Sequence, residues 1–274
     1  MSDGERPLST SIDVNVASVA RMCDYYLGGK DHYPADRRAC ERLNERLPGT
    51  RALIVNNRRF LRRTVRILAA DFGVRQFIDH GTGLPTHDNV HQVAQRVAPD
   101  SHVVYVGNDP LVLAHGRALL EEETSTAVVR ADPRDTQRVF SDPDTERLID
   151  FTKPVAVLFV SVMHCVPDDD DTPAALVRRV AARLAPGSFL VVSQLVSERE
   201  DIRDFVNTLM LDSTGGRWGS VRRTNDVREF FRGLDVLEPG LVDVSTWRPD
   251  SEVFPRQRSG SQEWIEYGGV GRIG

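Results

Sequence analysis

Five short apolar runs at nearly even spacing constrain the fold of this chain more than any other feature. They cover residues 76–79, 102–106, 127–130, 155–160 and 189–193. Their first residues lie 26, 25, 28 and 34 positions apart, which leaves room for one strand and one crossover helix each time. The runs are apolar throughout, as strands buried on both faces of a sheet are. The spacing predicts an α/β fold with a parallel sheet and right-handed crossovers.

Helix start signals separate these runs, at Thr86, at Asp109 with Pro110, at Ser141 and at Thr172 with Pro173. Beyond the fifth run, residues 198–212 are expected to be helical and residues 213–220 to form a loop. A helix capped by Thr224 is expected to end at Gly233. Residues 248–262 are expected to form a long polar connection to a final strand over residues 263–270.

Three helical patterns precede the first apolar run. Asp13 is expected to cap the first, which ends at Gly28, and Pro34 to open the second at its first position. Thr50 is expected to cap the third, which runs to about residue 70. We therefore predict a disordered tail over residues 1–12, an N-terminal helical cap over 13–72 and a core over 73–274, all in a single structural domain.

Composition excludes several classes of protein. The 274 residues carry 35 basic and 40 acidic side chains, a formal charge of −5, and their 40% hydrophobic content is enough for a core, which excludes intrinsic disorder. Residues 1–70 hold 13 basic and 8 acidic residues, so they carry +5 and the remainder carries −10. The three cysteines form no disulfide or zinc pattern, and no segment reads as a signal peptide or a bilayer span. These features predict a cytoplasmic protein, a monomer or homodimer, with no membrane or nucleic-acid partner.

The segment from Phe77 to Gly83 carries the strongest chemical signal. It places an acid, Asp79, at the end of a strand, followed by a Gly81-Thr82-Gly83 turn into an expected helix whose free amides could face a ligand. A site for a nicotinamide dinucleotide usually has glycine or alanine at the position of Thr86, and Asp79 would repel a pyrophosphate. The acid suits a cationic ligand such as S-adenosylmethionine, although a tight turn without a ligand is also open.

Polar side chains follow the next three strands as well. Carboxyl ends of parallel strands share one edge of the sheet, where open α/β sheets bind ligands. A ribose acceptor is expected at Asn108-Asp109-Pro110, an adenine acceptor at Ala131-Asp132, and further contacts at Ser161 and His164. His164 could act as a general base for a substrate hydroxyl or amine, or be a loop histidine with a structural partner.

Three weaker patterns favour structural explanations. His87 and His91 imitate a zinc-protease helix but lack its glutamate and a third ligand. The acidic run over residues 168–171 reads as a solvated segment, because adjacent side chains diverge. The third helix carries five arginines, which we interpret as a solvated face with only Arg58 turning inward. They are Arg58, Arg59, Arg62, Arg63 and Arg66. No metal site is predicted.

The chain resembles a family of S-adenosylmethionine-dependent methyltransferases, found mainly in actinomycetes and long catalogued as a domain of unknown function. The resemblance covers nearly the whole chain and rests on Ser18-Val19-Ala20-Arg21, Tyr26-Leu27-Gly28-Gly29-Lys30-Asp31, Asn57-Arg58, Gly81-Thr82-Gly83-Leu84-Pro85-Thr86, Asp88-Asn89-Val90-His91, Asn108-Asp109-Pro110, His164, Val166-Pro167-Asp168, Trp247-Arg248-Pro249-Asp250 and Tyr267-Gly268-Gly269-Val270-Gly271. It implies a Rossmann-like class I methyltransferase fold, whose seven-stranded, mostly parallel sheet has an antiparallel last strand.

The resemblance also implies a cofactor, S-adenosyl-L-methionine, with S-adenosyl-L-homocysteine as the product. It places the loop of Gly29 and Lys30 over that cofactor. The expected binding residues are Arg21, Gly29, Lys30, Arg58, Asp79, His80, Gly81, Thr82, Gly83, Asn108, Asp109, Pro110, Ala131, Asp132 and Ser161. Two positions depart from the family: Gly107 replaces its usual aspartate, for which Asp109 is a candidate substitute, and His80 replaces an aliphatic residue.

The leading functional hypothesis is methyl transfer to an oxygen, nitrogen or carbon nucleophile of a small molecule, with His164 as a possible base. Gly107 motivates a second hypothesis, a non-catalytic protein that binds an adenosyl ligand. A nicotinamide-dependent oxidoreductase is the third, and Thr86 and Asp79 argue against it.

Overall fold

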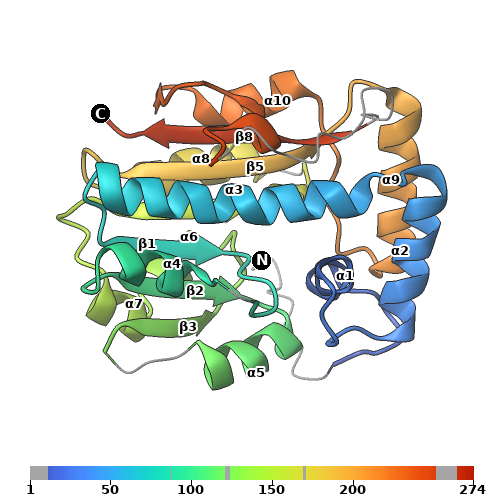
Figure 1. Ribbon diagram of the computed structural model, residues 1–274, viewed down its shortest axis with the longest axis horizontal. Coiled ribbons are helices and arrows are strands. Elements are labelled where there is room, and N and C mark those ends of the chain that lie inside the picture. The colour runs from blue at the N-terminus through green and yellow to red at the C-terminus, as the bar shows by residue number, and fades with distance from the viewer. Residues whose placement is uncertain (1–11, 87, 121–123, 169–170, 251–263) are drawn as a thin grey trace, which may run out of the picture.

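A mixed sheet of eight strands forms the centre of the protein (Figure 1). The computed structural model describes residues 12–86, 88–120, 124–168, 171–250 and 264–274. The strands are β1 (Gln76–His80), β2 (His102–Gly107), β3 (Thr126–Arg130), β4 (Ala156–Val160), β5 (Phe189–Val196), β6 (Asp235–Val236), β7 (Val242–Asp243) and β8 (Ile265–Arg272). Their order is β3-β2-β1-β4-β5-β8-β6, and β7 also pairs with β8.

The sheet confirms the class expected from the spacing of the apolar runs. Strands β1 to β5 pair in parallel, and β8 runs antiparallel to β5 over eight residue pairs. The described strands number eight rather than seven, because the short β6 and β7 pair separately with β8. The order along the sheet reverses between β1 and β4, and ligands of open α/β sheets bind in the crevice at such a switch point.

Helices cover both faces of this sheet. The α-helices are α1 (Val19–Leu27), α2 (Pro34–Arg46), α3 (Thr50–Asp71), α4 (Val90–Val97), α5 (Pro110–Leu119), α6 (Thr136–Phe140), α7 (Pro143–Leu148), α8 (Pro173–Ala181), α9 (Glu200–Ser213) and α10 (Thr224–Arg228). The 3₁₀ turns are η1 (Met163–Cys165), η2 (Glu229–Phe231) and η3 (Val244–Thr246). One apolar cluster packs α3 and α4 on one face, and another packs α6, α7, α8 and η2 on the opposite face.

Alternation along β1 decides which of its side chains reach each face. Phe77 lies in the cluster with α3, whereas Ile78 lies in the cluster with α8. Asp79 therefore points to the α3 side and His80 to the other side, since successive strand residues face opposite ways. The His80 ring stacks on Phe159, with the two ring centroids 4.5 Å apart.

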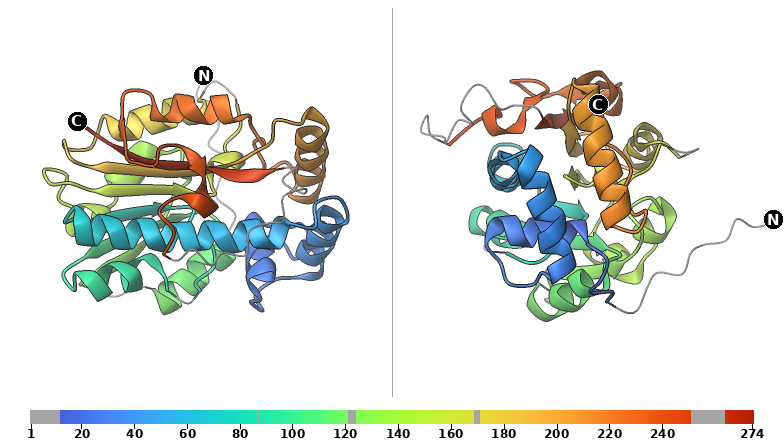
Figure 2. Two further views of the ribbon diagram at one scale, coloured as in Figure 1. Left: turned by 45° about the horizontal axis from the view of Figure 1, so that its top comes forward. Right: turned by 90° about the vertical axis from the view of Figure 1, so that its right-hand side faces the viewer.

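Helices α1, α2 and α9 gather at the carboxyl ends of the parallel strands (Figure 1), and Figure 2 shows this end face on. A third apolar cluster joins them: Leu43 of α2 and Met22 of α1 pack with Val206 of α9 and with Trp218. Helix α3 continues from this end across the sheet, where Phe60 and Leu68 are fully buried. The division into a cap over residues 13–72 and a core over 73–274 stays a prediction, and residues 1–11 of the expected tail lie outside the described residues.

Several predicted helix boundaries are confirmed. Pro34 is the first residue of α2, and α1 ends at Gly28, whose φ is +84°. Asp109 caps α5 and Thr172 caps α8, each with a side-chain oxygen that accepts from a backbone N–H.

Other start signals were wrong, because competing local hydrogen bonds move the boundary. Asp13 does not cap α1: its carboxylate accepts from Asn15 N, and the helix begins after Ser18. Thr50 is the first residue of α3 rather than its cap, and its hydroxyl donates to the carbonyl of Leu47.

The remaining differences lie between β1 and β4 and after β5. Helix α4 is capped by Asn89 rather than Thr86, because Asn89 and Gln92 form a capping box. Ser141 ends α6 instead of starting a helix, and α7 begins behind a new cap, Asp142. The helix at Thr224 ends at Arg228 and continues as η2. Most of the connection over residues 248–262 lies outside the described residues.

The stability of the N-terminal helices should depend on the buried ion pair between Arg21 and Asp36. Their side chains are 3% and 0% exposed, and Arg21 Nε lies 3.0 Å from the Asp36 carboxylate. Asp36→Ala leaves the guanidinium buried without its partner, so we expect a loss of about 3–5 kcal/mol of unfolding free energy, measured by urea denaturation. Asp201→Ala removes the exposed partner of Arg46 and should leave the unfolding free energy close to that of the wild type. Equal losses in the two variants would contradict this account.

Candidate active site

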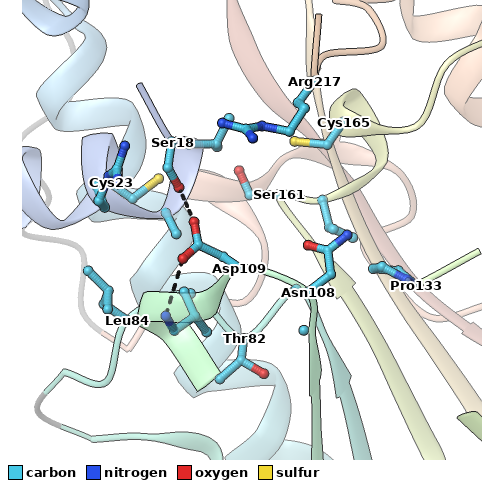
Figure 3. Close-up of a pocket in the computed structure, with 18 of the residues that line it drawn as sticks. Ser18, Cys23, Thr82, Leu84, Asn108, Asp109, Pro133, Ser161, Cys165 and Arg217 are labelled. Carbon is cyan, nitrogen blue, oxygen red and sulfur yellow. Dashed lines mark hydrogen bonds between the residues drawn. The ribbon is translucent and has the colours of Figure 1, made fainter. Parts of the chain in front are cut away.

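A cavity of about 2070 Å³ lies over the carboxyl ends of β1 to β4. Its floor comes from the residues that follow each of these strands, and its walls come from α1, α3 and the loop over residues 214–218. Figure 3 shows Ser18 and Cys23 on one side, Cys165 and Arg217 across from them, and Ser161 and Asn108 between. The cavity occupies the edge at which the sequence placed a ligand.

The glycine turn after β1 forms part of the floor. Gly81 and Gly83 have φ angles of +75° and +66°, in the left-handed region that favours glycine. A Cβ at Gly81 would lie 2.5 Å from Val162 Cγ2, whereas a Cβ at Gly83 would meet no atom within 4 Å. Gly81 is therefore required by packing, and Gly83 leaves open space above the turn.

The turn does not lead directly into a helix as predicted. Helix α4 begins only at Val90, and Leu84 is instead buried against Leu111 and Val112. None of the α4 residues lines the cavity. The N-terminal amides of α4 therefore do not face the ligand space.

Asp79 lines the cavity and is 4% exposed. Burial raises the pKa of its carboxyl to about 7, and the nearby positive charge of Arg58 opposes that rise. The structure gives this carboxylate no hydrogen bond within the described chain. His80, predicted to bind the cofactor, does not line the cavity; burial lowers its pKa to about 3.

Arg58 reaches the cavity from α3. Its Nη2 donates to the carbonyl of Asp88 and to Asn89 Oδ1, at 3.3 and 3.2 Å. Its Nε is buried and has no hydrogen-bond partner among the described residues. Burial lowers the pKa of this guanidinium, and the Asp79 carboxylate opposes that shift. A cation and a carboxylate thus share one wall, each with hydrogen-bonding capacity left over.

The residues after β2 were predicted to accept the hydroxyls of the ribose. Gly107, Asn108, Asp109 and Pro110 all line the cavity. Both oxygens of Asp109 are already engaged: Oδ1 accepts from Leu111 N at 2.8 Å, and Oδ2 accepts from the Ser18 hydroxyl at 2.6 Å (Figure 3). Asp109 therefore ties the segment before α1 to α5, which limits its use as a substitute ribose acceptor.

Beyond β3, Ala131 and Asp132 line the far end of the cavity. The Asp132 carboxylate forms an ion pair with Arg134, with 3.0 Å between Asp132 Oδ2 and Arg134 Nη2. Both side chains are partly exposed, so Asp132 remains accessible to a ligand.

Beyond β4, Ser161 lines the cavity and His164 does not. His164 is 2% exposed, and its ring centroid lies 4.9 Å from that of Trp218. Burial lowers the pKa of its imidazole to about 3, and Arg222 adds to the shift. The turn η1 brings Cys165 rather than His164 to the wall, so the structure does not bring the predicted base to the ligand space.

The residues predicted from the N-terminal segments are also divided. Arg21 lines the cavity, but its guanidinium is occupied by Asp36 and by the carbonyls of Asp13 and Val16. Gly29 and Lys30 do not line the cavity, and Lys30 is exposed. Gly29 packs against Asp24, where a Cβ would lie 1.9 Å from a carboxylate oxygen.

Sequence reasoning missed several lining residues, which are Ser18, Cys23, Asn57, Cys165, Arg217 and Trp218. Ser18 and Asn57 stand inside segments that carry the family resemblance, so that resemblance could have identified them. The loop over residues 213–220 was predicted as a loop, but nothing local indicates that it folds back over the sheet edge.

The weaker sequence patterns have structural roles. His91 Nδ1 lies 2.7 Å from the hydroxyl of Tyr105, while His87 lies outside the described residues. No group of three metal-ligating side chains exists in the part of the chain that the structure describes. Within the acidic run, Asp168 pairs with Arg222 and Asp171 with Arg179, and residues 169–170 are not described.

The prediction of a solvated arginine face was wrong for Arg63, which is 2% exposed and donates to the carbonyls of Val244 and Trp247.

None of the described helices combines the length and the apolar character that a bilayer span requires.

The strand order, the glycine turn after β1 and the cavity over the carboxyl edge define a Rossmann-like, class I methyltransferase fold. The family described as S-adenosyl methyltransferase matches residues 5–274, and the chain belongs to this family. Its cofactor is S-adenosylmethionine.

Two solved structures are similar over nearly the whole chain. A Thermobifida fusca protein named "putative methyltransferase" is 38% identical, with a TM-score of 0.87 over 95% of this chain and 96% of its own. A DUF574 family protein from Streptomyces avermitilis is 37% identical, with a TM-score of 0.87 over 96% of this chain and 99% of its own. Among curated proteins, none matches the chain.

Gly83 and Gly73 offer a matched pair for testing the site. Both have φ near +66°, at +66° and +67°, and at both a Cβ would meet nothing within 4 Å. Only Gly83 lines the cavity. Alanine at either position should cost about 1 kcal/mol of stability from the left-handed backbone. We expect Gly83→Ala to weaken S-adenosylmethionine binding at least tenfold in calorimetry, and Gly73→Ala to leave it unchanged. Unchanged affinity in both variants would place the ligand elsewhere.

Proposed function

We propose that this protein transfers a methyl group from S-adenosylmethionine to an oxygen, nitrogen or carbon nucleophile of a small molecule. The observation that carries the proposal is the pair of Asp79 and Arg58 on one wall: a buried carboxylate, and a half-buried arginine whose Nε is buried without a hydrogen-bond partner among the described residues. An α-amino acid ligand presents an ammonium and a carboxylate that match these two groups. When bound, S-adenosylmethionine supplies an electrophilic methyl group on a sulfonium.

The amino-acid end of the cofactor is assigned to Asp79 and Arg58. Gly83 leaves space for a ligand to pass close to the backbone. The ribose and adenine would then extend across the ends of β2 and β3, where Asn108 and Asp132 offer side-chain acceptors. Asn108 is the ribose partner in this assignment, because the Asp109 carboxylate already caps α5 and binds Ser18.

The size of the cavity supports a second ligand. Pockets for single small ligands hold roughly 300–1,000 Å³, and this cavity of about 2070 Å³ is larger. The remaining space lies toward α1 and the loop over residues 214–218, where Cys23, Ile54 and Trp218 line it. We assign this space to the methyl acceptor.

The segment before α1 acts as a cover over the site in this proposal. Arg21 holds the carbonyls of Asp13 and Val16, and Ser18 binds both Asp36 and Asp109. These bonds fix the cover against α5 and exclude water from the reacting end. Most of the rate acceleration would come from holding the two reactants in line.

A dinucleotide ligand fits the same cavity poorly. Its pyrophosphate would meet the Asp79 carboxylate, and no residue of α4 lines the cavity to offer helix N-terminal amides.

Gly107→Asp should tighten the binding of S-adenosylmethionine. The φ of Gly107 is outside the left-handed region, and its Cβ would lie 3.6 Å from Val112 Cγ1, an ordinary contact. A carboxylate there could accept from a ribose hydroxyl, a charge-assisted bond worth about 1.5–3 kcal/mol, so we expect tenfold or more in affinity. Gly107→Asn is the control with similar size and no charge. Weaker binding in the aspartate variant than in the asparagine variant would contradict the ribose assignment.

Cofactor affinity should depend on pH through Asp79. Its raised pKa, about 7, means that the carboxyl is largely protonated below pH 7 in the free protein. The cofactor ammonium favours the carboxylate, so binding should tighten as pH rises from 6 to 8. Asp79→Asn should bind more weakly, with most of this pH dependence gone. A full pH dependence in Asp79→Asn, measured by calorimetry, would remove Asp79 from the site.

A further inference from the structure

A buried carboxylate lies beneath the cavity floor and takes no part in the contacts described so far. Glu266 of β8 is 2% exposed. Its Oε1 accepts a hydrogen bond from the hydroxyl of Ser161, the residue that follows β4 and lines the cavity. Its Oε2 has no hydrogen-bond partner among the described residues. Ser161 is therefore a polar link between a buried acid and the ligand space.

The backbone of Ser161 is held in an unusual conformation. Its φ is +60°, in the left-handed region, which costs a residue other than glycine of order 1–3 kcal/mol. Ser161 N donates to Ser193 Oγ at 2.9 Å, and that hydroxyl donates to Asn57 Oδ1 at 2.8 Å. Surrounding strands thus hold the strained residue, and strain of this kind is typical of functional positions.

Glu266 has no structural reason to be an acid. It forms no ion pair within the described residues, and the titratable groups that face it are Asp243 of β7, Cys23 of α1 and Cys165 of η1, all without positive charge. Burial raises its pKa to about 7, the nearby hydroxyls of Ser161 and Ser193 oppose that rise, and Asp243 adds to it. Burying such a group is costly, and a glutamine could make the same bond to Ser161.

We propose that Glu266, acting through Ser161, accepts the proton that the methyl acceptor loses, and that the acceptor is therefore a hydroxyl or an amine. This inference rests on the proposed function. It names the nucleophile as one with a proton to release, which excludes aprotic carbon and thioether acceptors.

The proton balance is simple. As the acceptor bonds to the methyl group and the methyl–sulfur bond breaks, the acceptor's proton passes to Ser161 Oγ. The hydroxyl proton of Ser161 passes at the same time to Glu266 Oε1. The carboxylate becomes a carboxylic acid and the serine is restored. After the product leaves, the same path returns the proton to water.

Proton-linked calorimetry tests this without knowledge of the acceptor. S-adenosylmethionine and S-adenosylhomocysteine share the ammonium and carboxylate that Asp79 and Arg58 would meet, so proton release through Asp79 is common to both. Only S-adenosylmethionine carries the sulfonium charge, which should lower the pKa of Glu266. At pH 7, in two buffers of different ionisation enthalpy, we expect S-adenosylmethionine to release more protons on binding than S-adenosylhomocysteine does.

Glu266→Gln should abolish that difference and leave the affinity for S-adenosylhomocysteine within twofold of the wild type. Equal release for both ligands in the wild type, or a difference that persists in Glu266→Gln, would overturn the relay. If neither ligand binds, the proposed function fails and the relay fails with it. If both bind with equal release, the relay alone fails.

Turnover gives a second readout, with phenol and benzylamine as probes and tritiated methyl as the label. For a probe that the wild type methylates, Glu266→Gln should lower kcat at least 100-fold with KM for the cofactor within twofold, since general bases contribute about 10²–10⁴. Ser161→Gly removes the hydroxyl and relieves the left-handed strain, so it should fold well and lose a similar factor. Glu198→Gln changes an exposed acid that binds Thr224 and should leave the rate unchanged. A rate within threefold of the wild type in Glu266→Gln would overturn the proposal.

Discussion

The candidate site depends on two opposite charges, the buried Asp79 and the half-buried Arg58, that the fold places on one wall without joining them in an ion pair. Asp79 lies one residue before the end of β1, and Arg58 reaches the cavity from the long helix α3. Neither group has its hydrogen-bonding capacity filled by the described residues. Burial raises the pKa of Asp79 and lowers the pKa of Arg58, so it favours the neutral form of each. An arrangement of this kind lowers stability unless a ligand with complementary charges completes it. The glycine turn and the open space above it make room for such a ligand.

The N-terminal segments depend on a contrasting arrangement, in which the buried charges of Arg21 and Asp36 are paired. Asp36 accepts from Arg21, from Ser18 N and from Tyr33 N, and it is fully buried. Ser18 in turn reaches Asp109 across the cavity entrance. The N-terminal segments are therefore held by their own polar contacts, and the segment from Ser18 to Arg21 supplies several of them. Arg21, expected to bind the cofactor, lines the cavity but directs its guanidinium to Asp36 and to the carbonyls of Asp13 and Val16.

Local sequence was a good guide where local physics decides. Apolar runs predicted the five parallel strands, because strands buried on both faces need apolar residues throughout. Helix caps such as Asp109 and Thr172 were also predicted correctly, because the backbone N–H groups that they bind lie within three residues. Errors arose where a neighbouring group competes: Asn89 with Gln92 displaced the expected start at Thr86.

Long-range contacts were beyond such reasoning. His164 was expected at the ligand because it follows β4, but the single turn η1 brings Cys165 there instead. Glu266 reads as part of a strand, and only the pairing of β8 with β5 brings it beneath Ser161, 105 positions earlier in the chain. The left-handed backbone of Ser161 has no signal in the sequence, because it is held by contacts with Ser193 and Glu266 from two other strands.

A crystal structure of the complex with S-adenosylhomocysteine tests the central claim most directly. The account predicts that the ligand ammonium lies within hydrogen-bond distance of the Asp79 carboxylate and its carboxylate within the same distance of Arg58. It also predicts the adenine beside Asp132 and the sulfur facing the space between Ser161 and Cys23. A ligand seated elsewhere, or one whose amino-acid end points away from Asp79 and Arg58, would contradict it.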